Sequence, residues 1–283
     1  MKPTAILTMD VEDWYHLDYF DTSKCNVKYS LLDGLDIYRE LLDDYKIKSS
    51  FFVVGEIADH IDTKLRKLKK EGHEIGIHGL DHSLPMKLTL KKFKENIKEA
   101  KNRIENAIDS EISGYRAPCF SLDSERLKCV EQMGILYDSS RIDFGPHPLY
   151  ENLDVSDFEI VTPNIFRKNN FFEFEVSTHK ILNRSIPISG GGYLRIFPWL
   201  ITQKMIESYL KNNNLFVFYI HPFELSLKGN PDFPQGTSFS TKMRFGLGRK
   251  TVKKKLNSLI KMLLDADFRF ITFSELREEI ILT

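Results

Sequence analysis

Segments typical of strands alternate with segments typical of helices along this chain, and this alternation limits the possible folds more than any other feature. Runs of β-branched and aromatic residues predict strands, and apolar residues recurring every three or four positions predict helices between them. The expected strands are residues 50–54, 74–78, 171–176, 215–220 and 268–272, and the expected helices are residues 57–70, 90–108, 124–133, 199–210 and 252–264. The alternation predicts an α/β fold with a mostly parallel sheet, and roughly seven or eight strands favour a closed or nearly closed barrel.

Residues capable of catalysis stand where the expected strands end. In a parallel sheet the carboxyl ends of the strands meet at one edge, and in barrels of this kind the chemistry gathers there. The residues at these ends are Asp10, His78, Arg116, Asp138 and His221. We therefore expect one site at this edge, built from segments that are far apart in the chain.

The first strand end carries three acids within four positions. Asp10, Glu12 and Asp13 directly follow the apolar run at residues 6–9. Carboxylates this close repel one another unless a cation or an arginine lies among them. The cluster predicts one wall of a metal-dependent hydrolytic site.

Two histidines, His78 and His82, are four residues apart. If residues 79–82 form a helical turn, both rings face one side and can share a cation; two ordinary loop histidines are the alternative. The spacing alone is weak evidence, but next to a carboxylate cluster the interpretation as ligands is the better one. Two histidines and one carboxylate leave coordination positions open, as catalytic sites do, and they accept zinc, cobalt, nickel or iron.

Arg116, His221 and Asp138 suit the remaining roles. Arg116 is either a surface residue or a brace that holds and ionises a carboxylate acting as base. His221 ends the most apolar strand, so it is either a buried structural residue or a general acid that faces the site. Asp138 either orients a catalytic histidine or caps the turn that follows it.

Composition gives no reason to expect a nucleic-acid partner. Lys plus Arg and Asp plus Glu both number 40, and the basic run at residues 250–255 suits the solvated face of a helix. Three widely spaced cysteines fit neither a disulfide framework nor a cysteine-based zinc site. With no apolar signal segment and no run near ~18 apolar residues, we expect a cytoplasmic protein without an integral membrane segment.

Five motifs in this order resemble those of the polysaccharide deacetylase (NodB-homology, carbohydrate esterase 4-like) family. They are Thr8–Asp10, His78–His82, Gly114–Pro118, Tyr137–Ser140 and Ile220–Pro222. Two further stretches, residues 10–14 and 189–195, resemble the branch associated with bacterial exopolysaccharide biosynthesis. The resemblance extends from about residue 4 to about residue 276.

The resemblance implies a distorted (β/α)7-type barrel with one divalent metal, usually zinc. It implies hydrolysis of the N-acetyl group of an amino sugar in a polysaccharide or its precursor, with release of acetate. We accordingly expect one catalytic domain over residues 1–283, with irregular insertions at about 141–195 and 226–249.

Roles carry over by position in the motifs. Asp10 corresponds to the general base and His221 to the general acid, while His78 and His82 correspond to metal ligands and Arg116 to the brace for Asp10. The family most often has two adjacent aspartates, base and then ligand, but here Val11 follows Asp10.

Because the side chain of Val11 cannot coordinate a metal, the carboxylate ligand must be Glu12 or Asp13. Some relatives carry the acid two positions after the base, and this favours Glu12. Asp13 is the alternative.

Aromatic and glycine residues supply candidate substrate contacts. Trp14, Pro118 and Tyr193 are the candidates for contact with sugar rings, with core packing as the alternative for each. Residues 189–193 read as a flexible loop whose glycines let backbone approach a ligand, or else as a hinge or turn. A long polar loop is expected at residues 226–249.

Two other functions compete with a deacetylase. Another hydrolase of C–N bonds, such as a deformylase or a cyclic-imide hydrolase, uses similar residues. A non-catalytic carbohydrate-binding barrel is a further alternative, although a pure binder has no need of Asp10 and His221 together.

Overall fold

The protein is organised around a ten-stranded sheet, seen in a computed structural model that describes residues 1–143, 153–181 and 184–282. Its order is β11-β1-β2-β3-β4-β5-β8-β7-β6, with β12 also pairing with β1. The strands are β1 Thr4–Val11, β2 Ser50–Val53, β3 Glu74–Ile77, β4 Gly114–Tyr115, β5 Tyr137–Asp138, β6 Glu159–Thr162, β7 Ile165–Lys168, β8 Phe171–Phe174, β11 Leu215–Ile220 and β12 Arg269–Phe270. A separate hairpin joins β9 (Thr178–Ile181) to β10 (Arg184–Pro187).

All pairs from β11 through β1 to β5 and β8 are parallel, whereas β6 and β7 are antiparallel additions. The neighbouring strands β1 and β11 are almost continuously buried, as expected for strands covered on both faces. The parallel strands curl toward a barrel. An isolated parallel bridge pairs Gly190, which follows β8 in the sequence, with Tyr219 of β11. The expected distorted (β/α)7-type barrel is confirmed.

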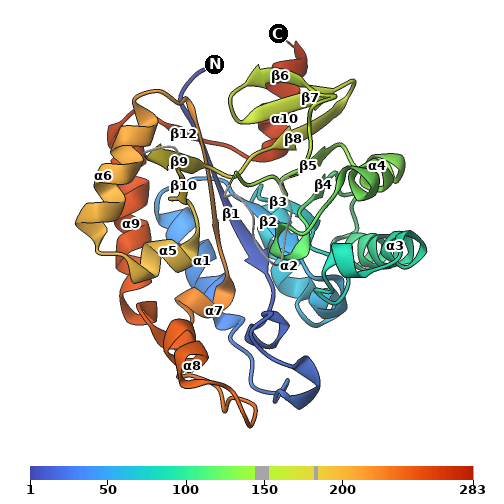
Figure 1. The fold of residues 1–283 in the computed structure, drawn as a ribbon, viewed down its shortest axis with the longest axis vertical. Helices are drawn as coiled ribbons and strands as arrows, with labels where there is room; N and C mark the ends of the chain where they lie inside the picture. The colour runs from blue at the N-terminus through green and yellow to red at the C-terminus, as the bar shows by residue number, and fades with distance from the viewer. Residues whose placement is uncertain (144–152, 182–183, 283) are drawn as a thin grey trace.

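Helices surround this curled sheet (Figure 1). They are α1 Asp33–Asp44, α2 Asp62–Lys70, α3 Leu90–Ile108, α4 Ser124–Gln132, α5 Gly191–Ile196, α6 Trp199–Leu210, α7 Pro222–Leu225, α8 Phe239–Gly246, α9 Arg249–Asp265 and α10 Phe273–Leu282. Short 3-10 turns are η1 Trp14–His16, η2 Thr22–Lys24, η3 Gly55–His60, η4 Pro85–Lys87 and η5 Pro118–Phe120.

Helix α3 shows how the local sequence sets these boundaries. The hydroxyl of Thr89 accepts a hydrogen bond from the Lys92 amide and caps the first turn. Apolar residues at steps of three and four then face the core, beginning with Phe93 and Ile97. Asp109, with φ of 51°, turns the chain out of the helix. The helix predicted at residues 90–108 is confirmed.

The inside of the barrel is filled by side chains rather than left open. Ile6, Phe52, Tyr137 and Phe174 point into it, and Phe273 from α10 packs against three of these rings. This apolar cluster lies beneath the polar residues at the strand ends.

Three expectations for individual segments are wrong. Residues 57–70 form two pieces, η3 and α2, instead of one helix. The supposed flexible loop at residues 189–193 leads into helix α5, and the supposed loop at residues 226–249 contains helix α8. Glycine-rich and short segments have little intrinsic helix propensity, so contacts from elsewhere in the fold hold these two helices in place.

The carboxyl ends of β1 and β11 point toward α7, whereas the two chain ends lie together at the other end of the molecule (Figure 1). Residues 144–152, part of the expected insertion at 141–195, lie outside the described residues. Among the helices that the structure describes, none is long and apolar enough to cross a membrane.

Candidate active site

A cavity of about 250 Å³ opens at the carboxyl edge of the parallel strands. Its walls include Asp10, Glu12, His78, His82 and His221, which come from three strand ends and the loop after β3. Five of the residues proposed from sequence for catalysis or metal binding therefore line one space.

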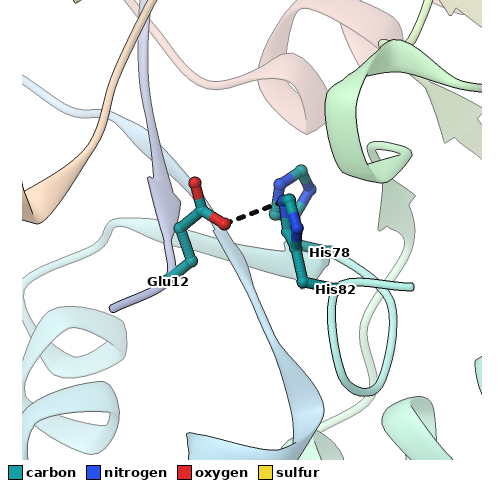
Figure 2. Close-up of side chains that lie close together, drawn as sticks. All are labelled: Glu12, His78 and His82. Atoms are coloured by element: carbon teal, nitrogen blue, oxygen red, sulfur yellow. Dashed lines mark ion pairs between the residues drawn. The ribbon is translucent and has the colours of Figure 1, made fainter. Parts of the chain in front are cut away.

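Glu12, His78 and His82 form a compact cluster (Figure 2). Each offers one ligand atom, and the three atoms lie within 4.8 Å of one another. The Oε2 atom of Glu12 lies 2.8 Å from Nε2 of His82, yet this buried oxygen makes no well-directed hydrogen bond. A buried carboxylate and two imidazoles left in this arrangement fit a divalent cation with an open coordination sphere.

The alternation of side chains along an extended strand explains why Val11 interrupts the acids. Residues two apart on such a backbone point to the same face, so Asp10 and Glu12 both reach the cavity. Val11 points the other way into the apolar core beneath the helices. The valine is therefore a packing residue between two site residues.

Burial and hydrogen bonding prepare His78 to act as a ligand. Its Nδ1 lies 2.8 Å from the carbonyl oxygen of Arg116, so this nitrogen carries the proton and Nε2 keeps its lone pair. Burial lowers the pKa of His78 to about 4, which keeps the ring neutral.

The other two members of the cluster form an ion pair. Burial would raise the pKa of Glu12, but the neighbouring histidines, His82 foremost, lower it to about 2. Burial would also lower the pKa of His82, yet pairing with Glu12 raises it. The carboxylate is thus ionised and close to both rings.

The loop that carries the two histidines is not a helical turn, so that expectation is wrong. Gly79 and His82 both adopt positive φ values, 74° and 59°. These left-handed positions fold the chain back so that the ring centres of His78 and His82 lie 5.2 Å apart. An added Cβ at Gly79 would meet Pro118 at 3.1 Å.

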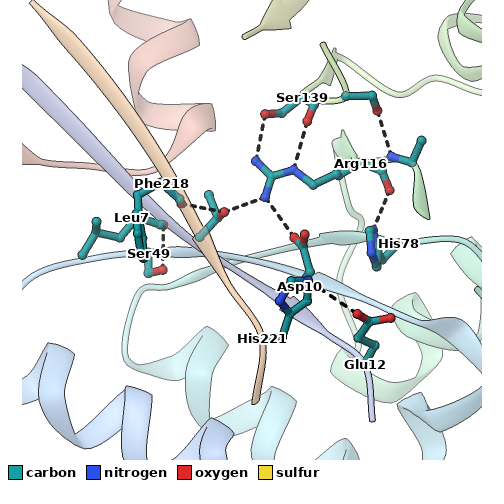
Figure 3. Close-up of polar contacts among 12 residues, drawn as sticks. Leu7, Asp10, Glu12, Ser49, His78, Arg116, Ser139, Phe218 and His221 are labelled. Atoms are coloured by element: carbon teal, nitrogen blue, oxygen red, sulfur yellow. Dashed lines mark hydrogen bonds and ion pairs between the residues drawn. The ribbon is translucent and has the colours of Figure 1, made fainter. Parts of the chain in front are cut away.

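Arg116 is completely buried and holds Asp10 in place (Figure 3). Its Nη1 donates to Asp10 Oδ1 at 2.9 Å and to the Thr8 hydroxyl at 2.6 Å, while Nε and Nη2 donate to Ser139. The guanidinium lies 4.4 Å from the centre of the Phe52 ring. With its donors bonded on several sides, this arginine keeps the Asp10 carboxylate at a set position.

Asp13 is not part of the cluster. Its Oδ1 accepts hydrogen bonds from the amides of Trp14 and Leu31, both at 2.8 Å, and it caps the turn η1. These contacts tie the chain after β1 to the segment that precedes α1. Of the two candidate carboxylates, only Glu12 lies with the histidines.

His221 faces the cavity and is supported from behind by Glu224. Its Nδ1 lies 3.2 Å from Glu224 Oε2, and its Nε2 lies 3.5 Å from Glu12 Oε1. Burial alone would lower the pKa of His221, but Glu224 and the acids of the site raise it to about 9. The ring is thus arranged to carry a proton on the nitrogen that faces the cavity.

Glu224 is itself fixed by Arg195, and sequence reasoning assigned a role to neither. Nε of Arg195 donates to Glu224 Oε1 at 2.9 Å, and both side chains are buried. The signals were present in the sequence, because Glu224 follows His221 by three positions and Arg195 ends the glycine-rich stretch. Their meaning depends on α5 lying against α7, which local pattern does not reveal.

The glycines before Arg195 permit this approach. A Cβ added to Gly191 would lie 2.0 Å from Glu224 Oε2 and 2.7 Å from Ile220. Only a residue without a side chain fits here. Gly191 is therefore a packing contact against Glu224, while the next residue, Gly192, lines the cavity.

Asp138 orients no histidine among the residues that the structure describes. Its two oxygens accept hydrogen bonds from the amide and hydroxyl of Ser140, and it pairs across the sheet with Glu173. It does not line the cavity. These contacts agree with the second role considered for Asp138, in which it caps the turn that follows it.

Of the candidate sugar contacts, Tyr193 alone lines the cavity. Trp14 is fully buried, with its indole N–H donating to the Tyr29 carbonyl, so no ring face is available to a sugar. Pro118 is also buried and packs against the histidine loop at Gly79. Cys119, which does line the cavity, has a φ of 51°.

Sequence comparison agrees with this geometry. Residues 36–137 match the model of the family described as polysaccharide deacetylase, and residues 145–278 match a domain of unknown function (DUF3473). The chain is 23% identical over 116 residues to a peptidoglycan deacetylase of Helicobacter pylori, a match that covers 40% of each chain. It is 35% identical over 75 residues to the peptidoglycan-N-acetylmuramic acid deacetylase PdaC of Bacillus subtilis, covering 26% of this chain and 15% of that one. The match thus spans two fifths or less of the length of these curated relatives.

Solved structures share the fold across almost the whole chain. The peptidoglycan N-acetylglucosamine deacetylase Bc1960 superposes with a TM-score of 0.55 at 16% identity, over 97% of this chain and 87% of that one. For BA3943, a CE4 family pseudoenzyme from Bacillus anthracis, the TM-score is 0.55 at 12% identity, over 98% and 66%. The motifs and the match over residues 36–137 thus show similarity to the polysaccharide deacetylase family, and the solved structures show that the fold is shared across almost the whole chain.

Proposed function

We propose that this protein hydrolyses the N-acetyl group of an amino sugar, within a polysaccharide or its precursor, and that it needs a divalent metal, zinc in the first instance. The observation that carries the proposal is the convergence of Asp10, His221 and the cluster of Glu12, His78 and His82 on one cavity. The names of the relatives favour an N-acetylated glycan of the peptidoglycan type as the substrate class.

The side chains of the site have separate roles in amide hydrolysis. Glu12, His78 and His82 would hold the metal, which when bound supplies Lewis acidity toward water and the amide carbonyl. Asp10, held by Arg116, accepts the proton of the attacking water. Nδ1–H of His221 donates a hydrogen bond to Glu224, so Nε2 presents its own proton to the cavity and delivers it to the departing amine.

The oxyanion of the tetrahedral intermediate needs a hydrogen-bond donor near the strand ends. The turn η5 carries Cys119 along the cavity wall, and its backbone N–H is the candidate. Cys119 and Phe120 both adopt left-handed conformations, which persist where the surrounding structure enforces them.

Removal of the base or of the acid tests the role assignment. We expect Asp10→Asn and His221→Ala each to lower the rate of acetate release from an N-acetylglucosamine oligomer by about 10²–10⁴-fold, because each loses one proton transfer. Circular dichroism should show that both variants remain folded.

The exposed pair Asp59→Asn and His60→Ala provides chemically matched controls that should keep full activity. Near-normal acetate release by either site variant would refute its assigned role. Turnover of a cyclic imide or an N-formyl substrate in place of the N-acetyl sugar would favour the other C–N hydrolases. Sugar binding without any turnover by the metal-loaded protein would favour a carbohydrate-binding barrel.

A further inference from the structure

Helix α8 carries an apolar stripe that nothing in the described structure covers. Phe239, Met243 and Leu247 follow one another at intervals of four, so they lie on one face, and their exposed fractions are 79%, 48% and 48%. A helix normally turns its apolar face toward the core. Here Phe245 alone of the helix is buried, and the stripe faces outward.

A second apolar group lies beside the first. At the junction of α5 and α6, Ile196, Phe197, Leu200 and Ile201 are exposed, Leu200 by 71%. The two groups are neighbours because Arg195 Nη1 donates to the carbonyl of Leu247 at 2.6 Å. About half of the large apolar side chains exposed in the described part of the chain belong to these two groups, a concentration typical of an interaction site.

Positive charge surrounds this apolar surface. Residues 233–264 contain eight Lys or Arg and no Asp or Glu, although the whole chain has equal numbers of acidic and basic residues. Six of the eight are exposed, and none of the six forms an ion pair with a described residue: Lys242, Arg244, Lys250, Lys253, Lys254 and Lys261. The basic run seen in the sequence is thus exposed at the start of α9, next to the end of α8.

The surface is continuous with the mouth of the cavity. Ile196 and Arg244 belong to it and also line the cavity. Its position is rigid, since Arg195 donates to the carbonyls of three residues near the end of α8 and Phe245 packs against Phe223 beneath. Whatever occupies the surface therefore sits beside the entrance to the site.

We propose that this surface, formed by the exposed apolar and basic residues of α5, α6, α8 and the start of α9, docks on an anionic lipid surface. Apolar side chains can enter the boundary between head groups and acyl chains while lysines stay at the level of the anionic head groups. A second copy would bring the same positive charge to the interface and be repelled. If the proposed deacetylation holds, docking also places the cavity where a saccharide carried by a lipid would be presented.

Vesicle co-sedimentation tests the proposal directly. The wild-type protein should bind phosphatidylcholine vesicles that contain phosphatidylglycerol, bind far less to pure phosphatidylcholine, and dissociate as salt is raised. The triple variant Lys250→Gln, Lys253→Gln, Lys254→Gln should bind more than tenfold more weakly, since one lysine at such a surface contributes about fivefold. Phe239→Ser with Met243→Ser should also weaken binding.

Matched controls come from the other parts of the molecule. Lys91→Gln, Lys94→Gln and Lys98→Gln remove the same charge from the exposed side of α3, and Ile160→Ser removes an apolar side chain that is 67% exposed on β6, at the opposite end from α8 (Figure 1). These variants should bind vesicles like the wild type. Acetate release from a soluble oligomer should be unchanged in all of them, which separates docking from catalysis.

Three results would overturn the proposal. The first is no preference of the wild type for anionic vesicles, and the second is an equal loss of binding in the control variants. The third is self-association of the wild type that Phe239→Ser with Met243→Ser abolishes, because a second copy would then cover the surface.

Discussion

Three neighbouring acids, Asp10, Glu12 and Asp13, have three different environments although their chemistry is nearly the same. Asp10 is paired with Arg116, Glu12 faces the two histidines, and Asp13 accepts two backbone N–H groups. The direction of each side chain decides this. Alternation along the strand sends the first two to the cavity, and the turn after β1 sends the third back toward the backbone.

Substitutions of Glu12 and Asp13 should distinguish the proposed metal ligand, Glu12, from the residue that caps the turn η1, Asp13. We expect Glu12→Gln to lose bound zinc after dialysis, as measured by elemental analysis, because an amide is a poor ligand for this ion. Asp13→Ala should keep its zinc but unfold with a free energy lower by about 0.5–2 kcal/mol in urea, since the cap is lost. Zinc retained by Glu12→Gln and lost by Asp13→Ala would reverse the assignment.

At the scale of elements, α5 links the glycine stretch to the proposed acid. It carries Arg195 to Glu224, which supports His221, and the same arginine anchors the end of α8. One short helix thus connects α8 to the part of the site contributed by β11, and all three elements lie outside the deacetylase family match. Its close packing depends on Gly191.

Alanine at Gly191 and at Gly192 should have opposite effects. At Gly191 the new methyl group would collide with Glu224 and Ile220, so we expect lower stability and at least tenfold slower acetate release. At Gly192 the nearest atom is 3.9 Å away, so alanine should be neutral or raise the free energy of unfolding by up to about 1 kcal/mol. Equal losses in both variants would contradict the packing role of Gly191.

At the scale of the whole molecule, a buried pair of acids bears on stability. Asp138 and Glu173 are opposite one another on β5 and β8, and neither is exposed. Burial raises the pKa of both groups, and for Glu173 the charge of Asp138 raises it further. Folding therefore favours the protonated pair.

This pair should make stability fall as pH rises. Because the pKa of Glu173 is higher in the folded state than its ordinary value of 4.5, its stabilising contribution is complete below that value and is lost as pH rises through the folded pKa. Glu173→Gln cannot ionise, so its free energy of unfolding should change less with pH. Urea denaturation of both proteins from about pH 5 to pH 9 measures the difference. Parallel curves for the two proteins would show that the pair does not control this dependence.

Much of the fold could be predicted because the strongest patterns are local. The strand at residues 215–220 and the helices at residues 90–108 and 199–210 have the boundaries that their apolar patterns predict. Helices α5 and α8 could not be found in this way, since each is short and held by contacts from distant residues. The same limit concealed Glu224 and Arg195.

The sequence by itself determined that Asp10, His78, His82, Arg116 and His221 would meet, because parallel strands bring their carboxyl ends to one edge. It also limited the carboxylate of the cluster to Glu12 or Asp13. Only the tertiary structure decided between these two, removed Trp14 and Asp138 from the site, and brought Glu224 and Arg195 into it. Which residues follow a strand is a local property, whereas the direction and burial of a side chain depend on the segments that pack around it.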